Sequence, residues 1–183
     1  MKIIDIHSET MWSQDHFLRK PSRELNEYEV LSPEFKAFVK TMFAALYNAP
    51  TGVGLAAPQL GIQIRLVVID IKRNGKKPLV LVNPSFEAIG EELVDSTETC
   101  LSFPELAGRV KRFKTVRVHA KNLQFEDIEF ESDSFLGIVC QHEIDHLNGI
   151  VYVDKAVDLF TLREHNESLA EKAIESLELC GGQ

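Results

Sequence analysis

The sequence predicts an α+β fold in which antiparallel strands pack around a central helix. Two observations lead to this prediction: an amphipathic helix pattern precedes several short strand-like segments, and a second apolar helix pattern follows them. Helices and strands segregated along the chain in this way are typical of α+β domains. The sequence has no internal repeat and no Pro/Gly/Ser-rich linker, so residues 1–183 are expected to form a single domain.

The first helix is predicted to begin directly after Ser32. Ser32 is a suitable N-cap, and Pro33 suits the first helical position because an N–H there would have no helical partner. Hydrophobic residues then recur at a spacing of three and four on one face: Phe35, Phe38, Val39, Met42, Phe43 and Leu46. This face should pack on the core.

Four segments in the middle of the chain predict strands, because they are rich in β-branched residues or alternate polar and apolar residues: 64–71, 78–83, 115–120 and 125–130. A turn at Gly75 should join the first two, and the Asn83-Pro84 pair should end the second. The polar stretch 96–99 is expected to be a turn.

A second helix is predicted to begin after Ser134 and to run to Gly149, a residue type common just beyond helix ends. Its apolar face includes two histidines: Phe135, Ile138, Val139, His142 and His146. The three apolar residues could line a pocket, although core packing explains them equally well. The tail, about 160–183, has weak helical periodicity and is expected to be a C-terminal surface helix.

Composition is that of an ordinary globular protein, with 44% hydrophobic and 26% charged residues. The longest aliphatic runs are far shorter than the roughly 18 apolar residues of a membrane helix. The N-terminus resembles neither a signal nor a transit peptide, and three cysteines are too few for a disulfide framework. A cytoplasmic location is therefore expected.

The formal net charge of −8 has the wrong sign for general attraction to DNA or to an anionic membrane. One local group of basic residues stands out: Arg109, Lys111, Arg112, Lys114, Arg117 and Lys121. We expect this basic group to be the solvated side of strands. The alternative is a rim that steers anions.

Residues 142–146, HEIDH, form an H-E-x-x-H motif on the second predicted helix. Imidazoles at positions i and i+4 lie one turn apart, so both can bind the same metal ion, with Glu143 beside them. This motif predicts a metal site.

The third protein ligand is left open by the residues alone. The metzincin pattern fails because Tyr152 occupies its third histidine position. Glu164 or Glu167 would complete a thermolysin-like set, whereas Cys100 would supply a thiolate suited to zinc or ferrous iron.

The glycine-rich segment 52–59, GVGLAAPQ, formally fits the dinucleotide fingerprint G-x-G-x-x-A. That fingerprint follows a strand and opens a helix, whereas this segment follows a helix and runs into Pro58. We interpret it as a loop whose small residues let the backbone approach a ligand, with Gln59 as its polar side chain. A simple helix-to-strand turn is the alternative.

Taken together, GVGLAAPQ at 52–59, ETCLS at 98–102 and QHEIDHL at 141–147 resemble the three ordered motifs of peptide deformylases. The resemblance extends from about Leu18 to about Asp154. It implies hydrolysis of the N-formyl group from the N-terminal formylmethionine of nascent peptides, with release of formate. The implied partners are such peptides, met close to the ribosome. Neither DNA nor a membrane is expected as a partner.

The resemblance also implies the residue roles. Cys100, His142 and His146 would bind one divalent metal ion, expected to be ferrous iron, with zinc, nickel and cobalt as alternatives.

Glu143 would be the catalytic acid/base. The Gln59 amide and the Leu101 backbone N–H would bind the oxyanion, and the backbone at Val53 and Gly54 would hold the peptide.

Thr99 departs from the family motif, which has glycine at this position. If the backbone there needs a positive φ, threonine would cost about 1–3 kcal/mol, which predicts a strained but active site with a narrowed entrance. In the other account, Thr99 is extended and contacts the substrate.

The alternative function is a noncatalytic deformylase-like metal protein that binds a peptide or a partner.

Overall fold

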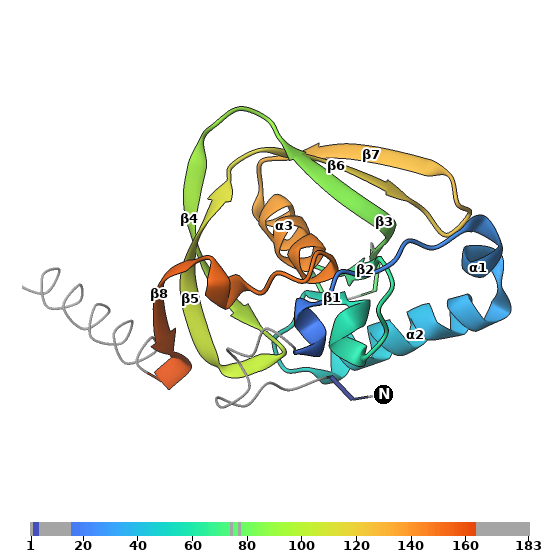
Figure 1. Cartoon of the computed structure of the whole chain (residues 1–183), viewed down its shortest axis with the longest axis horizontal. Helices are drawn as coiled ribbons and strands as arrows, with labels where there is room; N and C mark the ends of the chain where they lie inside the picture. The colour runs from blue at the N-terminus through green and yellow to red at the C-terminus, as the bar shows by residue number, and fades with distance from the viewer. Residues whose placement is uncertain (1, 4–15, 74, 77, 164–183) are drawn as a thin grey trace, which may run out of the picture.

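The computed structural model describes residues 2–3, 16–73, 75–76 and 78–163, and its helix α3 (Phe135–Leu147) lies between two antiparallel sheets (Figure 1). The larger sheet has the strand order β1 (Gly54–Ala56), β2 (Leu66–Ile69), β3 (Leu79–Ala88), β6 (Val116–Lys121) and β7 (Asp127–Ser132). The smaller sheet has the order β4 (Leu93–Cys100), β5 (Phe103–Phe113) and β8 (Ala156–Thr161). The predicted α+β arrangement around a central helix is confirmed.

The remaining helices are α1 (Glu27–Leu31), α2 (Pro33–Asn48) and three 3₁₀ turns: η1 (Phe17–Arg19), η2 (Ala57–Leu60) and η3 (Tyr152–Asp154). Helix α2 is the first predicted helix, and the Ser32 hydroxyl caps it by accepting a 3.1 Å hydrogen bond from the Phe35 N–H. Its buried face packs beside β1 and β2. Among the described residues, no helix is long and apolar enough to span a membrane.

Strands β2, β3, β6 and β7 correspond to the four predicted strand segments, but the prediction that Asn83-Pro84 ends a strand was wrong. Strand β3 continues to Ala88 because Asn83 takes a φ of 49° and the pairing with β6 shifts register between Val82 and Ser85. The Asn83 amide also pairs with both backbone groups of Leu25, at 2.9 and 2.8 Å. The chain bulges at this point instead of turning.

The stretch 96–99, expected to be a turn, lies in strand β4 and pairs with residues 107–110 of β5. Threonine favours extended backbone, and a partner strand supplies the pairing that a local pattern does not reveal. Strand β8 was also missed: residues 160–161 end this strand, so the predicted tail helix does not begin there. Residues 164–183 of that predicted helix lie outside the described residues.

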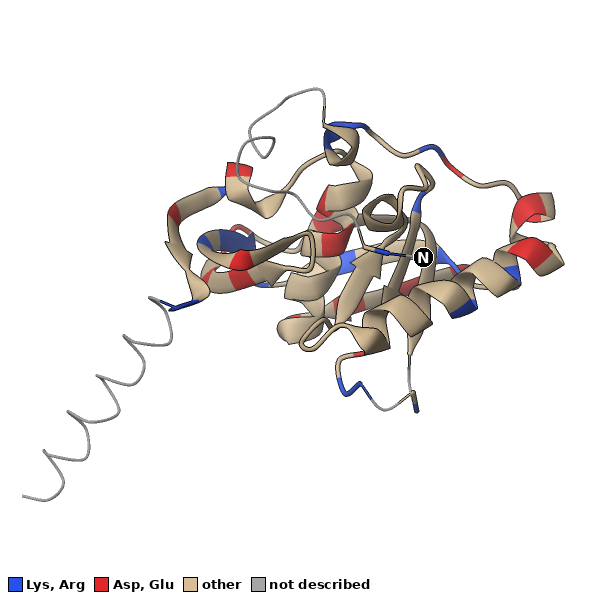
Figure 2. Cartoon of the chain, turned by 90° about the horizontal axis from the view of Figure 1, so that it is seen from below, with Lys and Arg blue, Asp and Glu red and all other residues tan. Residues whose placement is uncertain are grey.

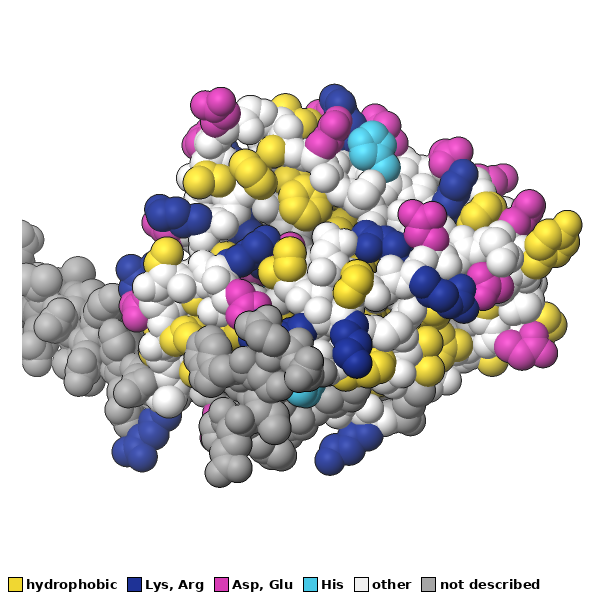
Figure 3. Space-filling model, in the orientation of Figure 1, with side chains coloured by type: hydrophobic (Ala, Val, Ile, Leu, Met, Phe, Trp, Pro, Cys, Tyr) yellow, Lys and Arg dark blue, Asp and Glu magenta, His cyan; other side chains and the backbone are white. Residues whose placement is uncertain are grey.

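The basic group is neutralised by neighbouring acids. The ion pairs are Arg109 with Asp158, Lys111 with Asp95, Arg112 with Glu98 and Asp145, Lys114 with Glu92, Arg117 with Glu87, Glu129 and Glu131, and Lys121 with Asp127. Figure 2 shows basic segments among acidic ones in the strands, and the face drawn in Figure 3 likewise mixes both signs. An anion-steering rim is therefore not supported. The expectation that the whole group is solvated was wrong for Arg112, which is only 2% exposed.

Helix α3 is buried on most of its circumference, because both sheets contact it. Its polar residues Gln141, His142, Glu143, Asp145 and His146 are consequently buried as well. Buried polar groups need partners, so these side chains are the starting point for the functional site.

Candidate active site

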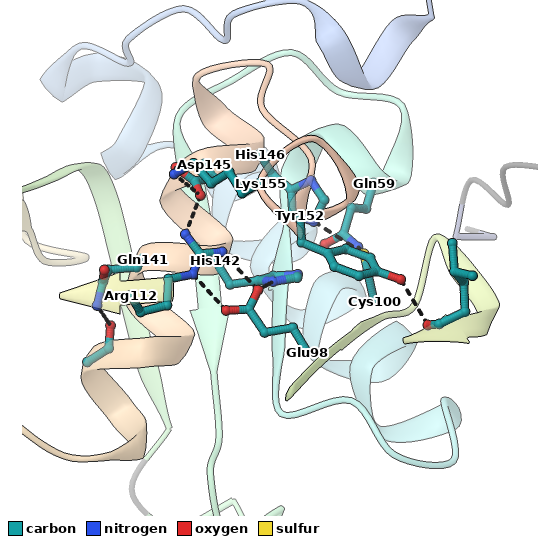
Figure 4. Close-up of polar contacts among 12 residues, drawn as sticks. Gln59, Glu98, Cys100, Arg112, Gln141, His142, Asp145, His146, Tyr152 and Lys155 are labelled. Carbon is teal, nitrogen blue, oxygen red and sulfur yellow. Dashed lines mark hydrogen bonds and ion pairs between the residues drawn. The ribbon is translucent and has the colours of Figure 1, made fainter. Parts of the chain in front are cut away.

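Three potential metal ligands meet where the end of β4 contacts α3. The side chains of Cys100, His142 and His146 are buried, and one ligand atom from each lies within 4.8 Å of the others. The Cys100 Sγ lies 3.3 Å from the His146 Nε2 (Figure 4). A thiolate and two imidazoles are a donor set that suits a divalent transition metal, so these residues fit the implied ion.

The ends of α3 are fixed by local contacts. The Ser134 hydroxyl accepts a hydrogen bond from the Leu136 N–H at 3.4 Å, which caps the first turn. Gly149 has a φ of 74°, and a Cβ there would lie 2.5 Å from the Arg19 carbonyl oxygen. Glycine is therefore required at this end of the helix, close to His146.

The Glu98 carboxylate orients His142. Its Oε2 lies 2.8 Å from the His142 Nδ1, which leaves the His142 Nε2 to act as a ligand. Although burial alone would raise the pKa of Glu98, hydrogen bonds from Arg112 and His142 lower that pKa to about 2. The two Arg112 bonds are bidentate, at 2.6 and 2.8 Å.

The network continues beyond Arg112 (Figure 4). Arg112 also pairs with Asp145 of the HEIDH motif, and the Lys155 Nζ donates to Asp145 Oδ2 at 2.7 Å. We call Glu98, Arg112 and Asp145 the buried ion network. Sequence reasoning missed it, although strand alternation puts Glu98 on the same face as Cys100 two residues later.

Glu143 is 5% exposed, and its Oε2 has no hydrogen-bond partner within the described part of the chain. Burial disfavours the charged carboxylate and raises the pKa of Glu143 to about 7. Gly54 makes room for this side chain, since a Cβ on Gly54 would lie 2.5 Å from Glu143 Oε1. The glycine-rich segment therefore does bring the backbone close to another group, as expected from its small residues.

Gln59 has a fixed orientation within η2. Its Oε1 accepts a 2.9 Å hydrogen bond from the Ala56 N–H, so its Nε2 must face the other way. That Nε2 lies 3.4 Å from Cys100 Sγ and 3.3 Å from Ser102 Oγ. We call the five buried residues at this point the polar cluster: Gln59, Cys100, His142, Glu143 and His146.

A cavity of about 540 Å³ opens onto the polar cluster. Leu101, Val53 and Gly54 line it, and so do the three apolar residues of the α3 face: Phe135, Ile138 and Val139. We call the loop 49–53, Thr99, Phe135 and Ile138 the cavity wall. None of the wall residues is buried.

Thr99 lies within β4 opposite Ala107 and is not among the residues with positive φ. The prediction of backbone strain at this position was therefore wrong, because the extended backbone of a strand accepts a β-branched residue readily. The side chain is exposed and borders the cavity.

Tyr152 occupies the position at which the metzincin pattern has its third histidine. Its side chain packs against the site. Its ring stacks on His142 with centroids 5.9 Å apart, and its hydroxyl donates to the Leu106 carbonyl at 2.9 Å. Glu164 and Glu167, the thermolysin-like candidates, lie outside the described residues.

Comparison with known proteins identifies the family. The family model described as "Polypeptide deformylase" matches residues 9–161. The chain belongs to the polypeptide deformylase family. Peptide deformylase 1 of Clostridium acetobutylicum is 42% identical over 144 residues, which are 79% of this chain and 91% of that relative. The peptide deformylase of Aquifex aeolicus is 40% identical over 144 residues, covering 77% and 82% of the two chains.

Solved structures agree with this family. The crystal structure of the peptide deformylase from Thermotoga maritima matches with a TM-score of 0.73 and 33% identity, covering 85% of this chain and 97% of that one. A peptide deformylase from Synechococcus elongatus in complex with actinonin matches with a TM-score of 0.71 and 35% identity, covering 87% and 82%. The expected family, fold class and deformylase activity are confirmed, and the noncatalytic alternative has no support.

Proposed function

We propose that the cavity is the active site of this deformylase and that Cys100, His142 and His146 hold one divalent metal ion there. The observation that carries this proposal is the meeting of one thiol and two imidazoles beside the Glu143 carboxylate, whose Oε2 has no hydrogen-bond partner among the described residues. When bound, such an ion supplies Lewis-acid polarisation and makes water more acidic.

Glu143 is the proposed acid/base. Its free Oε2 can accept a proton from the attacking water and then deliver that proton to the leaving amine. Both transfers need a carboxylate that is close to the substrate and not engaged by a cation. Its position on the cavity surface supports this role, and the hydrogen bonds of the nearby Arg112 guanidinium go to Glu98 and Asp145.

Gln59 and Leu101 are the proposed oxyanion donors. The carbonyl side of the Gln59 amide is held by the Ala56 N–H, so the amide N–H is already directed toward Cys100 before substrate binds. A donor that needs no reorientation stabilises developing negative charge more effectively than one that must turn. The Leu101 backbone N–H would act from the end of β4.

Peptide binding is assigned to the cavity wall and to the strand edges beside it. The backbone at Val53 and Gly54 would hold the peptide main chain, while Phe135, Ile138 and Val139 offer apolar contact area for a methionine side chain.

The finer biological assignments are also proposals. Ferrous iron is the proposed ion, because thiolate and imidazole ligands suit it, as they also suit zinc, nickel and cobalt. Residues 1–183 would act as one catalytic domain in the cytoplasm, on chains emerging close to the ribosome.

The test is formate release from formyl-Met-Ala-Ser by protein purified without oxygen, with acetyl-Met-Ala-Ser as the matched control. We expect formate from the first peptide and no cleavage of the second. Metal-loaded protein that releases no formate would contradict the proposal.

A further inference from the structure

The loop 49–53 of the cavity wall joins α2 to β1 and borders the cavity along its whole length. Among the described residues, backbone hydrogen bonds hold this loop only at its ends. The Ala49 N–H donates to the Ala45 carbonyl at 3.2 Å, and the Val53 carbonyl accepts from the Asp70 N–H at 2.8 Å. The middle of the loop needs another support, because a loop without internal pairing has many accessible conformations.

The Arg73 guanidinium supplies that support. Its Nη2 donates to the Ala49 carbonyl at 2.6 Å, and its Nη1 donates to the Gly52 carbonyl. The same two nitrogens reach the last turn of α2, at the Leu46 and Tyr47 carbonyls, at 3.3 and 3.2 Å. One planar cation thus joins a helix C-terminus, which favours positive charge, to both sides of the loop.

Arg73 is itself held in place by a turn. Its backbone N–H donates to the Asp70 carbonyl at 3.1 Å. The Asp70 carboxylate accepts from the Tyr47 hydroxyl at 2.7 Å and from the Gly75 N–H at 2.8 Å. The turn after β2 is therefore fastened to α2, and the arginine is presented to the loop from a fixed base.

The loop position matters for the site because Gly52 contacts Leu101. A Cβ on Gly52 would lie 2.5 Å from Leu101 Cδ1, so the loop already packs against the Leu101 side chain, and both residues line the cavity. Arg73 does not line the cavity, yet it holds Gly52 against the residue whose backbone N–H is a proposed oxyanion donor.

We propose that Arg73 is a positioning residue for peptide binding, which acts by holding the loop 49–53 at the distance from Leu101 that the peptide requires. The inference rests on the proposed function, since its ligand is the formyl-methionyl peptide. Without the guanidinium the loop would move more freely. Peptide binding would then have to order the loop, and the lost conformational entropy would weaken the binding.

The test compares Arg73→Ala and Arg73→Lys with Arg117→Ala. Arg117 is a matched control, because it is also an arginine with several partners but lies on β6 away from the cavity. With metal content matched, KM for formyl-Met-Ala-Ser should rise about tenfold in Arg73→Ala, the size expected for about one hydrogen bond, while kcat changes less than about threefold. Arg73→Lys should be intermediate, and Arg117→Ala should match the wild type.

A merely structural role predicts a different result. Lower thermal stability with an unchanged KM in folded Arg73→Ala would overturn the proposal, and so would a fall in kcat alone. If Arg73→Ala does not fold, the KM of Arg73→Lys decides, and a value within about twofold of wild type overturns the proposal.

Calorimetry of the product peptide Met-Ala-Ser separates this inference from the proposed function, because it needs no turnover. If the wild type releases no formate, the catalytic proposal fails on its own. A dissociation constant for the product peptide that is about tenfold larger in Arg73→Ala than in Arg117→Ala would still support the positioning role. Equal constants would overturn it.

Discussion

The polar cluster and the cavity wall are next to each other but are built in opposite ways. Every residue of the polar cluster is buried, and the buried ion network holds His142 through the Glu98 carboxylate. The wall is partly or fully exposed, and hydrogen bonds from the Arg73 side chain join its loop to the end of α2. The difference suggests a division of roles: the polar cluster determines whether the reaction proceeds, and the wall determines how well a peptide fits.

The largest effect is expected at Cys100. Cys100→Ala removes the thiolate ligand, so metal analysis should find almost no bound ion and formate release should fall to background. Cys140→Ala is the matched control, since Cys140 is also buried but is not part of the ligand group. Full metal occupancy in Cys100→Ala would show that Cys100 is not a metal ligand.

Glu143→Gln should separate chemistry from metal binding. The variant keeps the shape of the side chain but cannot transfer a proton, so kcat should fall by about 10²–10⁴-fold while the metal content stays unchanged. Glu34→Gln, on the exposed side of α2, should have wild-type kinetics. A metal-loaded Glu143→Gln enzyme with normal kcat would exclude Glu143 as the acid/base.

The ion network should matter for stability as well as for the metal. Arg112→Met leaves the Glu98 and Asp145 carboxylates buried without their common cation, which should cost about 3–5 kcal/mol in free energy of unfolding. Metal affinity should fall about 10–100-fold, because His142 loses a firmly held partner. Urea unfolding and metal titration measure the two effects. Arg117→Met is the control, because the ion pairs of Arg117 lie at the surface of β6, and it should unfold at nearly the same urea concentration as the wild type.

The smallest effect is expected at Thr99, in the cavity wall. Because the backbone of Thr99 is extended and unstrained, Thr99→Gly should relieve no backbone strain. It should instead remove a side-chain contact surface beside the cavity. We expect KM for formyl-Met-Ala-Ser to rise about two- to fivefold, equivalent to less than about 1 kcal/mol, with metal content unchanged. A rise in kcat/KM would instead indicate that Thr99 strains the entrance. The cavity wall would then affect the reaction itself and not only the fit of the peptide.

The same two regions differ in how far the sequence predicts them. Helices α2 and α3 were predictable because caps and apolar spacing are local, and with α3 came His142 and His146 at the correct separation. The partners of the ion network were not predictable, since Arg112 lies 14 residues from Glu98 and 33 from Asp145. The pairing of β4 with β5 places Glu98 and Arg112 on neighbouring strands, and the packing of α3 against β5 adds Asp145. No short-range sequence pattern reports either arrangement.

Arg73 shows the same limit from the side of the wall. In the sequence it is one basic residue in a turn, and its carbonyl partners lie 21 to 27 residues earlier. Only the packing of the turn after β2 against the end of α2 reveals that it supports the loop 49–53.

The central claim is that this chain performs deformylation with a metal ion held by the Cys100, His142 and His146 group. The most direct test is to remove the ion with a chelator under anaerobic conditions and then to titrate ferrous iron back, measuring bound metal and formate release on the same samples. We predict that formate release disappears with the ion and returns in proportion to occupancy, with full activity at one ion per chain. Unchanged formate release from metal-free protein, or no recovery at full occupancy, would contradict the account.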